Sequence, residues 1–552
     1  MNKAAFTHLI ASPWCFPVSK TQIQIKLRTA KDIKQVSLTY GDPHQGHIVN
    51  GVWGWAGHIE PMSCSGNGED HLYWTLIITP PQGRLKYNFT ISDDHETVIF
   101  GERCILGPQD EVDNFNYFFY PYLHDQPIYS APKWVKDTVW YQIFPDRFNS
   151  IPSKKHWPLG PVTNATHYGG NLLGIIDKLP YLSELGISGL YLTPIFESPS
   201  THKYDTTDYF KIDPDFGTLE DLKVLVKKAH DLGIKVMLDA VFNHAGIHFE
   251  AWNLAKDDPK SPYRKWFYFN EKGYETFSFA KNMPKLNTTN PEVIDYFCSV
   301  GQYWIKEADI DGWRLDVANE ISPQFWRSFR TSVRSIKEVY ILGEVWHDSN
   351  PWLLGDQFDA VMNYFYTRII MDYFIHKTMT LESFREKIDD FRNRYPQLVL
   401  KNQFNLYDSH DTARLLTQAD GNIALVKQML ALLLCSEGSP CIYYGTEIAL
   451  EGGQDPDCRR LMQFDPDPVK HELYRFIKTF LLLRKTYSVL ANEGSWEWIS
   501  HETLLLIKRN DLVLIINPSS KPCECPVKGN ILYTESSSSL CSAYDIKLIQ
   551  IG

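Results

Sequence analysis

The segment Ile310-Asp-Gly-Trp-Arg-Leu-Asp-Val-Ala-Asn-Glu320 has the pattern of a short strand that ends in charged side chains. Successive side chains of a strand point to opposite faces, so Arg314 and Asp316 share one face with Gly312. A cation beside a carboxyl group favours the ionised carboxylate, which can act as a nucleophile at a strand end. The same pair can also be purely structural, because ion-pair networks perturb carboxyl groups in many folds. The rest of the sequence decides between these interpretations.

The middle of the chain repeats this pattern, because short apolar segments alternate there with segments of helical periodicity. The helical pattern is clear at 219–232 and 292–307. Eight strands that alternate with helices predict an α/β fold of the (β/α)8 type, a TIM barrel. The predicted strands are 138–144, 187–193, 234–240, 312–317, 339–345, 358–362, 404–407 and 441–444.

Regions of β pattern flank the predicted barrel on both sides. Residues 1–122 alternate apolar and polar side chains in short runs between turn residues, which predicts a β-sandwich of roughly immunoglobulin size. Residues 496–552 return to strands, with a hairpin at 503–516, and predict a small C-terminal all-β domain. The catalytic barrel would then occupy 123–495.

One interval inside the barrel region is unusually long. Residues 244–290 are aromatic and irregular, and long loops in compact domains are usually functional. We therefore expect a small inserted subdomain that walls one side of the barrel mouth.

Composition narrows the class of protein. The chain has 552 residues, 43% of them hydrophobic and 22% charged, which is typical of a multidomain globular protein. A net charge of −11 argues against nucleic acid as a partner. The sequence shows neither a signal peptide nor an apolar segment long enough to cross a membrane, so we expect a cytoplasmic protein with no membrane partner. Its ten cysteines lack zinc-type spacing, so we expect free thiols.

Polar residues gather at the C-terminal ends of the predicted strands, where TIM-barrel enzymes place their sites. Clustered carboxylates raise one another's pKa, so such a cluster is costly unless one acid must be protonated and another ionised. Glycoside hydrolysis requires that division. The strand ends supply Asp239, Asn243, His244, Arg314, Asp316, Glu344, His410 and Asp411.

The local sequence suggests how the acids divide the work. Asp316, beside Arg314, suits the ionised carboxylate. Glu344 stands among apolar neighbours, which would raise its pKa and suit it as the acid. Asp411 would hold sugar hydroxyls and stabilise positive charge as it develops. For Asp239, a structural pairing with an arginine and a direct role both stay open.

The segments 239–244, 312–316, 343–345 and 409–411 resemble the four signature regions of the α-amylase family (glycoside hydrolase family 13). This resemblance extends over the whole chain. It implies a retaining α-glycosidase with Asp316 as nucleophile, Glu344 as acid/base and Asp411 as transition-state stabiliser. It also implies that sugar is contacted by Tyr204, His244, Arg314 and His410.

Other segments are similar to the neopullulanase, cyclomaltodextrinase and maltogenic amylase group. They are 283–287, 317–320, 344–346 and 454–460. The resemblance implies hydrolysis of α-1,4-glucosidic bonds in cyclodextrins, maltodextrins or pullulan, with transglycosylation, by a homodimer. It also implies that the α-glucan oligosaccharide is bound by Glu320, Trp346, Asp455 and Arg459.

Two alternatives stay open within this resemblance, together with the preferred substrate. One is an α-1,6-acting oligosaccharide glucosidase of the same superfamily, against which 283–287 and the N-terminal sandwich argue. The other is a non-catalytic sugar-binding relative, against which the presence of Asp316, Glu344 and Asp411 argues.

One departure from the family pattern concerns calcium. Many relatives bind calcium through an acidic loop after the first strand and a later Gly-Gly-Asp. Here the loop reads Asn149-Ser-Ile-Pro-Ser-Lys-Lys155, and Gly169-Gly-Asn171 lacks the acid. Because calcium prefers several charged oxygen ligands, we expect no structural calcium at this loop, and no other metal or cofactor.

Overall fold

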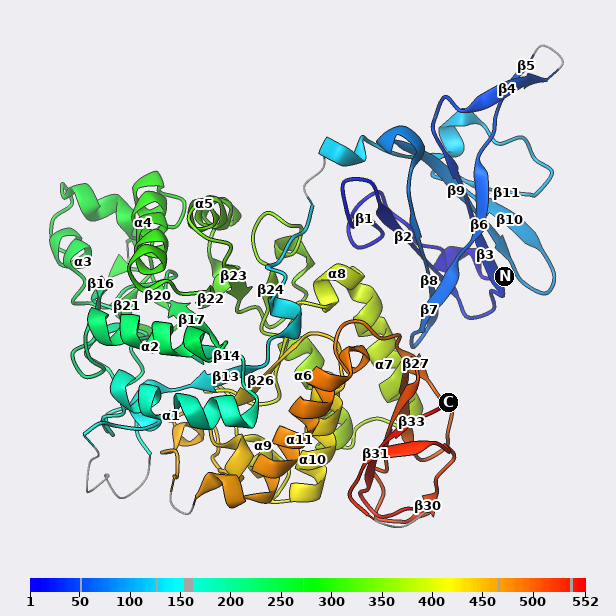
Figure 1. The fold of residues 1–552 in the computed structure, drawn as a ribbon. Coiled ribbons are helices and arrows are strands. Elements are labelled where there is room, and N and C mark those ends of the chain that lie inside the picture. The colour runs from blue at the N-terminus through cyan, green and yellow to red at the C-terminus, as the bar shows by residue number, and fades with distance from the viewer. Residues whose placement is uncertain (50–51, 126–127, 153–161, 272, 465–466, 537–539) are drawn as a thin grey trace. The chain divides into compact units, whose positions relative to one another are not determined.

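The computed structural model describes residues 1–49, 52–125, 128–152, 162–271, 273–464, 467–536 and 540–552 (Figure 1). The chain forms two compact units. The first contains Met1–Ser130, Asn350–Gly355 and Thr378–Leu400. The second contains Ala131–Ser349, Asp356–Lys377 and Lys401–Gly552.

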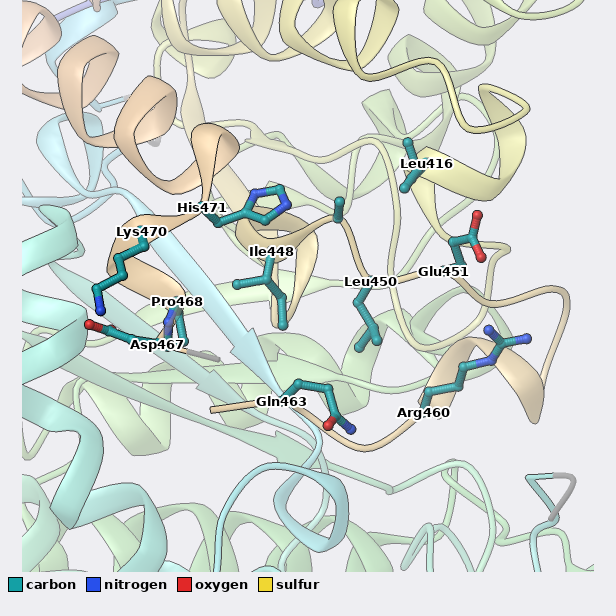
Figure 2. A pocket seen from close by; sticks show the side chains of 11 residues that line it. Leu416, Ile448, Leu450, Glu451, Arg460, Gln463, Asp467, Pro468, Lys470 and His471 are labelled. Carbon is teal, nitrogen blue, oxygen red and sulfur yellow. The ribbon is translucent and has the colours of Figure 1, made fainter. Parts of the chain in front are cut away.

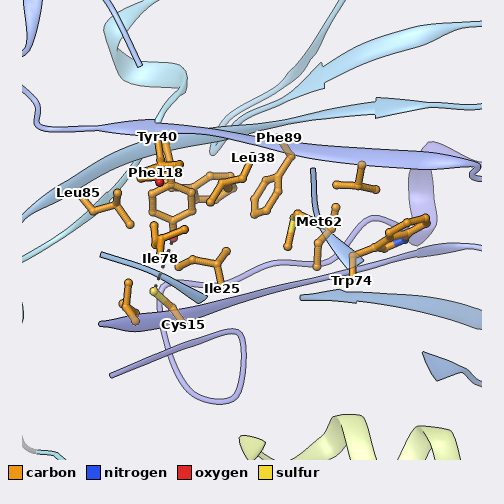
Figure 3. Close-up of a cluster of buried hydrophobic side chains, with 14 of the residues drawn as sticks. Cys15, Ile25, Leu38, Tyr40, Met62, Trp74, Ile78, Leu85, Phe89 and Phe118 are labelled. Carbon is orange, nitrogen blue, oxygen red and sulfur yellow. Dashed lines mark hydrogen bonds between the residues drawn. The ribbon is translucent and has the colours of Figure 1, made fainter. Parts of the chain in front are cut away.

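The first unit is built on a β-sandwich, as predicted. One antiparallel sheet has the order β1 (Cys15–Pro17), β2 (Ile23–Ala30), β8 (His71–Ile78), β7 (Ser63–Asn67). The other has the order β11 (Ile105–Leu106), β10 (Thr97–Phe100), β9 (Leu85–Ser92), β3 (Gln35–Gly41), β6 (His58–Pro61), with β12 (Phe118–Tyr120) on β9. Inward side chains of both sheets, among them Ile25, Leu38, Trp74 and Phe89, form one apolar core (Figure 3).

Two helices distant in sequence also belong to the first unit. They are α7 (Leu381–Arg394) and α8 (Gln397–Leu400). The backbone N–H of Asn67 at the end of β7 donates to Asp389 on α7 at 2.9 Å. Lys26 on β2 donates to the carbonyl of Tyr395, just after α7, at 2.7 Å. These polar contacts fix the end of α7 against the sandwich.

The second unit contains the predicted (β/α)8 barrel. Eight parallel strands pair in the order β24-β23-β22-β17-β14-β13-β26-β25, and a parallel bridge from Met362 to Phe404 connects the two ends. Each strand falls within, or within two residues of, its predicted position. The strands are β13 (Trp140–Ile143), β14 (Gly189–Leu192), β17 (Lys235–Ala240), β22 (Gly312–Leu315), β23 (Tyr340–Gly343), β24 (Ala360–Val361), β25 (Phe404–Asn405) and β26 (Ser439–Tyr443).

Helices follow the strands because their sequences carry both caps and apolar faces. At the start of α2, Thr218 and Asp221 cap each other's backbone N–H groups, and Leu222, Leu225 and Ala229 are buried. The helices are α1 (Leu172–Leu185), α2 (Leu219–Asp231), α4 (Pro291–Ala308), α5 (Pro323–Arg334), α6 (Tyr364–Phe374), α9 (Leu415–Gln418), α10 (Ile423–Leu434) and α11 (Glu472–Thr486).

Alternate residues of the strands fill the barrel interior. Trp140, Tyr191, Met237 and Leu342 belong to one buried cluster. The residue two positions after an inward residue also points inward, so polar side chains near the C-terminal strand ends form the top of this interior.

The segment after β17 has its own short elements, in agreement with the expected insertion. They are α3 (Glu250–Ala255), η7 (Pro262–Trp266), and the hairpins β18 (Phe269–Asn270) with β19 (Gly273–Tyr274) and β20 (Thr276–Phe277) with β21 (Ala280–Pro284).

The chain ends in the predicted all-β region. Its main sheet has the order β27 (Glu497–Trp498), β28 (Leu505–Arg509), β29 (Leu512–Ile516), β33 (Ile546–Gln550), β31 (Asn530–Thr534), and β30 (Cys523–Glu524) pairs with β32 (Leu540–Cys541). The β28–β29 hairpin is the predicted one. In the part of the chain that the structure describes, no helix is long and apolar enough to cross a bilayer.

Candidate active site

Arg314 lies at the centre of the site. It is fully buried on β22, and its register partners are Asp239 on β17 and Leu342 on β23. An arginine cannot lose its charge in a protein, so a buried guanidinium requires carboxylate partners. The barrel supplies them from several strand ends.

Four carboxyl groups surround this guanidinium. Nη1 lies 2.7 Å from Asp316 Oδ1 and 3.1 Å from Asp239 Oδ1. Nη2 lies 2.8 Å from Glu344 Oε2 and 4.0 Å from Asp411 Oδ2. The structure thus brings together the residues predicted from four separate strand ends.

Three of these carboxyl groups keep their protons to a higher pH than isolated acids would, chiefly because they are buried. Burial raises the pKa of Asp316, and the adjacent Arg314 guanidinium works against that rise. Burial also raises the pKa of Asp411, again opposed by Arg314 and then by Arg459. Burial raises the pKa of Asp239 to about 6 despite two hydrogen bonds from Arg314 and one from Tyr191.

The backbone after β22 adopts an unusual conformation. Val317, directly after Asp316, has φ 46° and ψ 42°, in the left-handed region that a β-branched residue rarely enters. Its N–H donates to Glu344 Oε2 at 2.9 Å. Strain of this kind persists where surrounding contacts impose it, often at functional sites. Here it gives the carboxylate at the end of β23 a backbone donor from the end of β22.

The surroundings of Glu344 differ from those predicted. Apolar neighbours in sequence led us to expect an apolar pocket. The carboxylate instead pairs with Arg314, accepts the Val317 N–H, and accepts the indole N–H of Trp346 at 3.0 Å. Leu342 and Val345 beside it in sequence are buried, but the carboxylate itself lies among polar groups. The neighbouring residues in the sequence indicated a buried backbone, but they could not indicate the hydrogen-bond donors that reach the carboxylate from β22 and from Trp346.

His410 and Tyr204 contact two acids of the cluster, Asp411 and Asp239 respectively. Their rings are parallel, with centroids 5.6 Å apart, and the Tyr204 hydroxyl contacts both His410 Nε2 and Asp239 Oδ2. Gln142 Nε2 lies 2.6 Å from the other ring nitrogen of His410. Gln142 was not predicted; the signal that could have found it is a polar residue two positions after Trp140 on the inward face of β13.

Arg459 connects the loop after β26 to the site. Its Nη1 lies 2.9 Å from Asp455 Oδ1 and its Nη2 lies 3.5 Å from Asp411 Oδ1. Its Nε donates to the carbonyl of His410 at 2.9 Å. The predicted residues Asp455 and Arg459 therefore lie beside Asp411.

The remaining predicted sugar contacts differ in how they are presented. Trp346 is 48% exposed and stacks on Tyr364, with ring centroids 3.6 Å apart. Glu320 pairs with Lys285 near the inserted hairpins. His244 is buried, its Nε2 contacts the carbonyl of Tyr204 at 3.0 Å, and burial lowers its pKa to about 4. In this conformation the Nε2–H of His244 donates its hydrogen bond to the backbone carbonyl of Tyr204.

A separate cavity of about 570 Å³ lies outside this carboxylate cluster. Figure 2 shows it lined by Leu416, Ile448 and Leu450 with charged side chains such as Glu451 and Arg460. None of its lining residues is among the predicted catalytic acids. The chemistry is therefore assigned to the cluster at the strand ends.

The loop at 149–155, where we expect no calcium, is only partly described, because 153–161 lie outside the described residues. Asn171 is described. Its side-chain oxygen accepts the N–H groups of Gly174 and Ile151, and its amide donates to the Ile151 carbonyl. The side chain that replaces the acid of Gly-Gly-Asp is thus used in capping α1.

Comparisons with known proteins identify the family. Residues 142–478 match the α-amylase catalytic domain, and residues 1–124 match the α-amylase N-terminal ig-like domain. A cyclomaltodextrinase from Geobacillus thermopakistaniensis (strain MAS1) is 43% identical, covering 96% of this chain and 93% of that protein. A maltogenic α-amylase from Bacillus acidopullulyticus is 42% identical, covering 96% of this chain and 94% of that protein.

Solved structures agree with the sequence comparisons. The solved structure of a cyclomaltodextrinase superposes with a TM-score of 0.90 and 35% identity, covering 100% of both chains. The carboxylate cluster, the barrel and the flanking β domains therefore have one common explanation. The chain belongs to the α-amylase family of glycoside hydrolases.

Proposed function

We propose that this enzyme hydrolyses α-1,4-glucosidic bonds of cyclodextrins, maltodextrins or pullulan with retention of anomeric configuration, and that it also transfers glycosyl groups to sugar acceptors. The names of the relatives support this substrate class, since they include cyclomaltodextrinases, a maltogenic α-amylase and a neopullulanase. The observation that best supports the proposal is that the guanidinium of Arg314 pairs with both Asp316 and Glu344, which holds the two acids close together.

The proposed reaction assigns one role to each acid. Asp316 attacks the anomeric carbon while Glu344 gives a proton to the departing glycosidic oxygen, which leaves a glycosyl ester on Asp316. Glu344, now a carboxylate, takes a proton from water as the water attacks the same carbon and releases Asp316. A sugar hydroxyl in place of water completes transglycosylation. Asp411, next to Arg459, holds sugar hydroxyls and stabilises the positive charge that develops on the ring.

Two aromatic residues support a proposed position for the leaving group. Trp346 donates to Glu344 Oε1 and stacks on the buried Tyr364, which fixes its indole beside the proton donor. Aromatic faces bind sugar rings through their apolar surfaces. We place the leaving-group sugar over Trp346, with Glu320 nearby, and the sugar at the cleavage point against Tyr204, His244, Arg314 and His410.

The acid role is tested with Glu344→Gln on two kinds of substrate. A poor leaving group needs the proton, whereas an activated aryl glycoside departs without it. We expect turnover of maltodextrin to fall by several orders of magnitude and turnover of the aryl glycoside to fall far less. Equal losses on the two substrates would contradict the assignment.

An α-1,6 activity is the second candidate. One observation favours it: a solved cyclic α-maltosyl-(1→6)-maltose hydrolase from Arthrobacter globiformis is 31% identical over 76% of this chain, with a TM-score of 0.70. Chromatography of pullulan digests separates the candidates. Cleavage of α-1,4 bonds releases panose or isopanose, depending on which of the two bonds in each repeat is cut, whereas cleavage of α-1,6 bonds releases maltotriose. Parallel digests of cyclodextrin, maltodextrin and starch rank the α-1,4 substrates.

We also propose the domain limits, the cytoplasmic location and the homodimer that we expect from the sequence. Support for the domain limits 1–122, 123–495 and 496–552 comes from the family matches at 1–124 and 142–478. A cytoplasmic location is supported by a relative from Bacillus subtilis named intracellular maltogenic amylase, 41% identical over 93% of this chain. The homodimer rests on the resemblance to the same group, and sedimentation velocity of the purified chain tests it.

A further inference from the structure

Gln142 is a buried polar side chain inside the barrel with a contact to the proposed site. It lies on β13, has no exposed surface, and pairs in register with Tyr191 and Tyr443. Its Nε2 lies 2.6 Å from Nδ1 of His410. Among the described residues, its Oε1 has no hydrogen-bond partner. Burial of an amide that lacks hydrogen-bond partners costs free energy of folding. We therefore expect a role for Gln142 in the side-chain hydrogen bond that it makes to His410.

His410 is held in the neutral state by its surroundings. Burial lowers its pKa well below the ordinary value, and the nearby Arg459 and Arg314 add to that effect. The other titratable groups that face it are Glu344, His202, Asp411 and Tyr204. A neutral imidazole carries one N–H, so the partner of one ring nitrogen decides what the other can do.

The geometry selects one direction of hydrogen bonding. If Gln142 Nε2 donates to Nδ1, the proton of His410 sits on Nε2. That N–H faces the Tyr204 hydroxyl and Asp411 Oδ2 at 3.3 Å. The Tyr204 O–H is then free to donate to Asp239 Oδ2 at 3.1 Å.

The opposite direction leaves mismatched atoms. If Oε1 of Gln142 faced Nδ1, the proton would move to that nitrogen and Nε2 would become an acceptor. Nε2 would then face the Asp411 carboxylate with no proton between them. It would also take the Tyr204 proton away from Asp239. The donor direction from Gln142 therefore satisfies His410, Tyr204 and Asp239 together.

We propose that Gln142 is a positioning residue that fixes the tautomer of His410, so that its Nε2–H points at Tyr204 and Asp411. The proposal rests on the roles proposed above for the carboxylate cluster. Gln142 touches no substrate. It acts through His410, and its loss lets Nδ1 take the proton, which removes the donor that holds Asp411 and Tyr204 in place.

Nuclear magnetic resonance tests the tautomer directly. In enzyme labelled with ¹⁵N-histidine, we expect the Nδ1 of His410 to have the shift of an unprotonated nitrogen and the Nε2 that of a protonated one. His410→Asn assigns the signals. In Gln142→Met, which has a similar shape and no donor, we expect the two signals to exchange or average. Unchanged signals in Gln142→Met would overturn the proposal.

The pH dependence of a second variant gives an independent test. Gln142→Glu places a carboxyl group at Nδ1, which donates to that nitrogen only when protonated. The ratio of its kcat to the wild-type kcat should rise as the pH falls. For Gln142→Met the ratio should be lowered about tenfold, as for loss of one hydrogen bond, and should not vary with pH. A ratio for Gln142→Glu that does not vary with pH would contradict the proposal.

Two controls separate structural damage from the proposed effect. Gln428 on α10 is also fully buried, and its amide donates to the carbonyl of Asn517, which follows β29 in the C-terminal β region. Gln428→Met should lower the melting temperature and leave the His410 signals and kcat unchanged. Asp316→Asn should lose activity in the presence of an intact Gln142, and retained activity in this variant would refute the proposed acid roles. The His410 spectrum tests the role of Gln142 separately, because it does not depend on activity.

Discussion

Arg314 determines how the four acids share charge. Its two terminal nitrogens contact carboxyl groups from β17, β22 and β23, and it has no exposed surface. A buried ion pair adds little net stability, but removal of one partner leaves an uncompensated charge. Asp239, Asp316 and Glu344 therefore share a single cation, whereas Asp411 also has Arg459 beside it.

Arg314→Met should therefore abolish activity and lower the free energy of unfolding by about 3–5 kcal/mol, because three carboxylates lose their buried partner. Urea denaturation and product assays measure the two effects. Arg330→Met is the control: Arg330 on α5 pairs with the buried Asp359 at 2.8 Å and contacts none of the four acids in the cluster. Asp359 keeps Arg334 as a second partner at 2.7 Å, so this variant should cost less stability than Arg314→Met and leave the activity of the folded fraction intact. Full activity in Arg314→Met would contradict the arrangement.

Asp239 should make folding depend on pH. A carboxyl group whose pKa is higher in the folded state stabilises the fold below its ordinary pKa of 3.8. It loses that contribution as the pH rises through about 6. The free energy of unfolding of the wild type minus that of Asp239→Asn should thus fall by about 1–3 kcal/mol between pH 4 and pH 7. Denaturation midpoints across this range measure it, and a difference that rises with pH would refute the assignment.

At the scale of elements, strand β22 is flanked by a stabilising acid at one end and by a proposed catalytic acid at the other. Asp311 precedes it at the N-terminal side of the barrel, and Asp316 follows it at the C-terminal side. Burial alone would raise the pKa of Asp311. Hydrogen bonds from His230 and the Val236 N–H, with the charge of Lys337, lower it to about 2. Polar residues at the N-terminal side of such barrels serve stability.

Asp311→Asn should lower the free energy of unfolding by about 2 kcal/mol at pH 7 and leave kcat unchanged. The sign follows from a lowered pKa: the stabilisation is present above pH 3.8 and is lost as the pH falls towards about 2. The loss should therefore shrink in acid. Asp309, which is exposed, gives the control variant Asp309→Asn with little effect. A loss that stays constant down to pH 2.5 would contradict this account.

Strand positions were predictable because apolar runs and their turn residues act locally. All eight barrel strands lie at or close to the expected positions, and the acids follow from their place at strand ends. The environment of Glu344 was not predictable, because its donors come from β22 and from Trp346, which only the closed barrel brings together. Gln142 was missed for the same reason, since its partner His410 is 268 positions away in the chain.

At the scale of the whole molecule, the compact units do not follow simple sequence blocks. The sandwich unit includes Asn350–Gly355 and Thr378–Leu400 as well as the N-terminal residues. The reason is chemical: α7 ends in polar and carbonyl groups that Lys26 and Ser65 satisfy from within the sandwich. A sequence boundary at a strand pattern could not reveal these long-range contacts.

Removal of metal should leave the whole enzyme unchanged. Asn171 uses its side chain on the backbone of Ile151 and Gly174. Calcium would need charged oxygens in its place. Dialysis against EDTA should change neither the melting temperature nor the activity. Stoichiometric calcium in a dialysed sample, removed by EDTA with a loss of melting temperature, would contradict this prediction.

The nucleophile assignment is tested most directly by trapping the glycosyl-enzyme. A 5-fluoro-α-glucosyl fluoride reacts through its activated leaving group, and Glu344→Gln slows the hydrolysis of the ester that forms. Mass spectrometry of the peptides should then find one glycosyl group on Asp316, and Asp316→Asn should carry none. A label on any other residue, or no label while the substrate is turned over with inversion, would contradict the proposed mechanism.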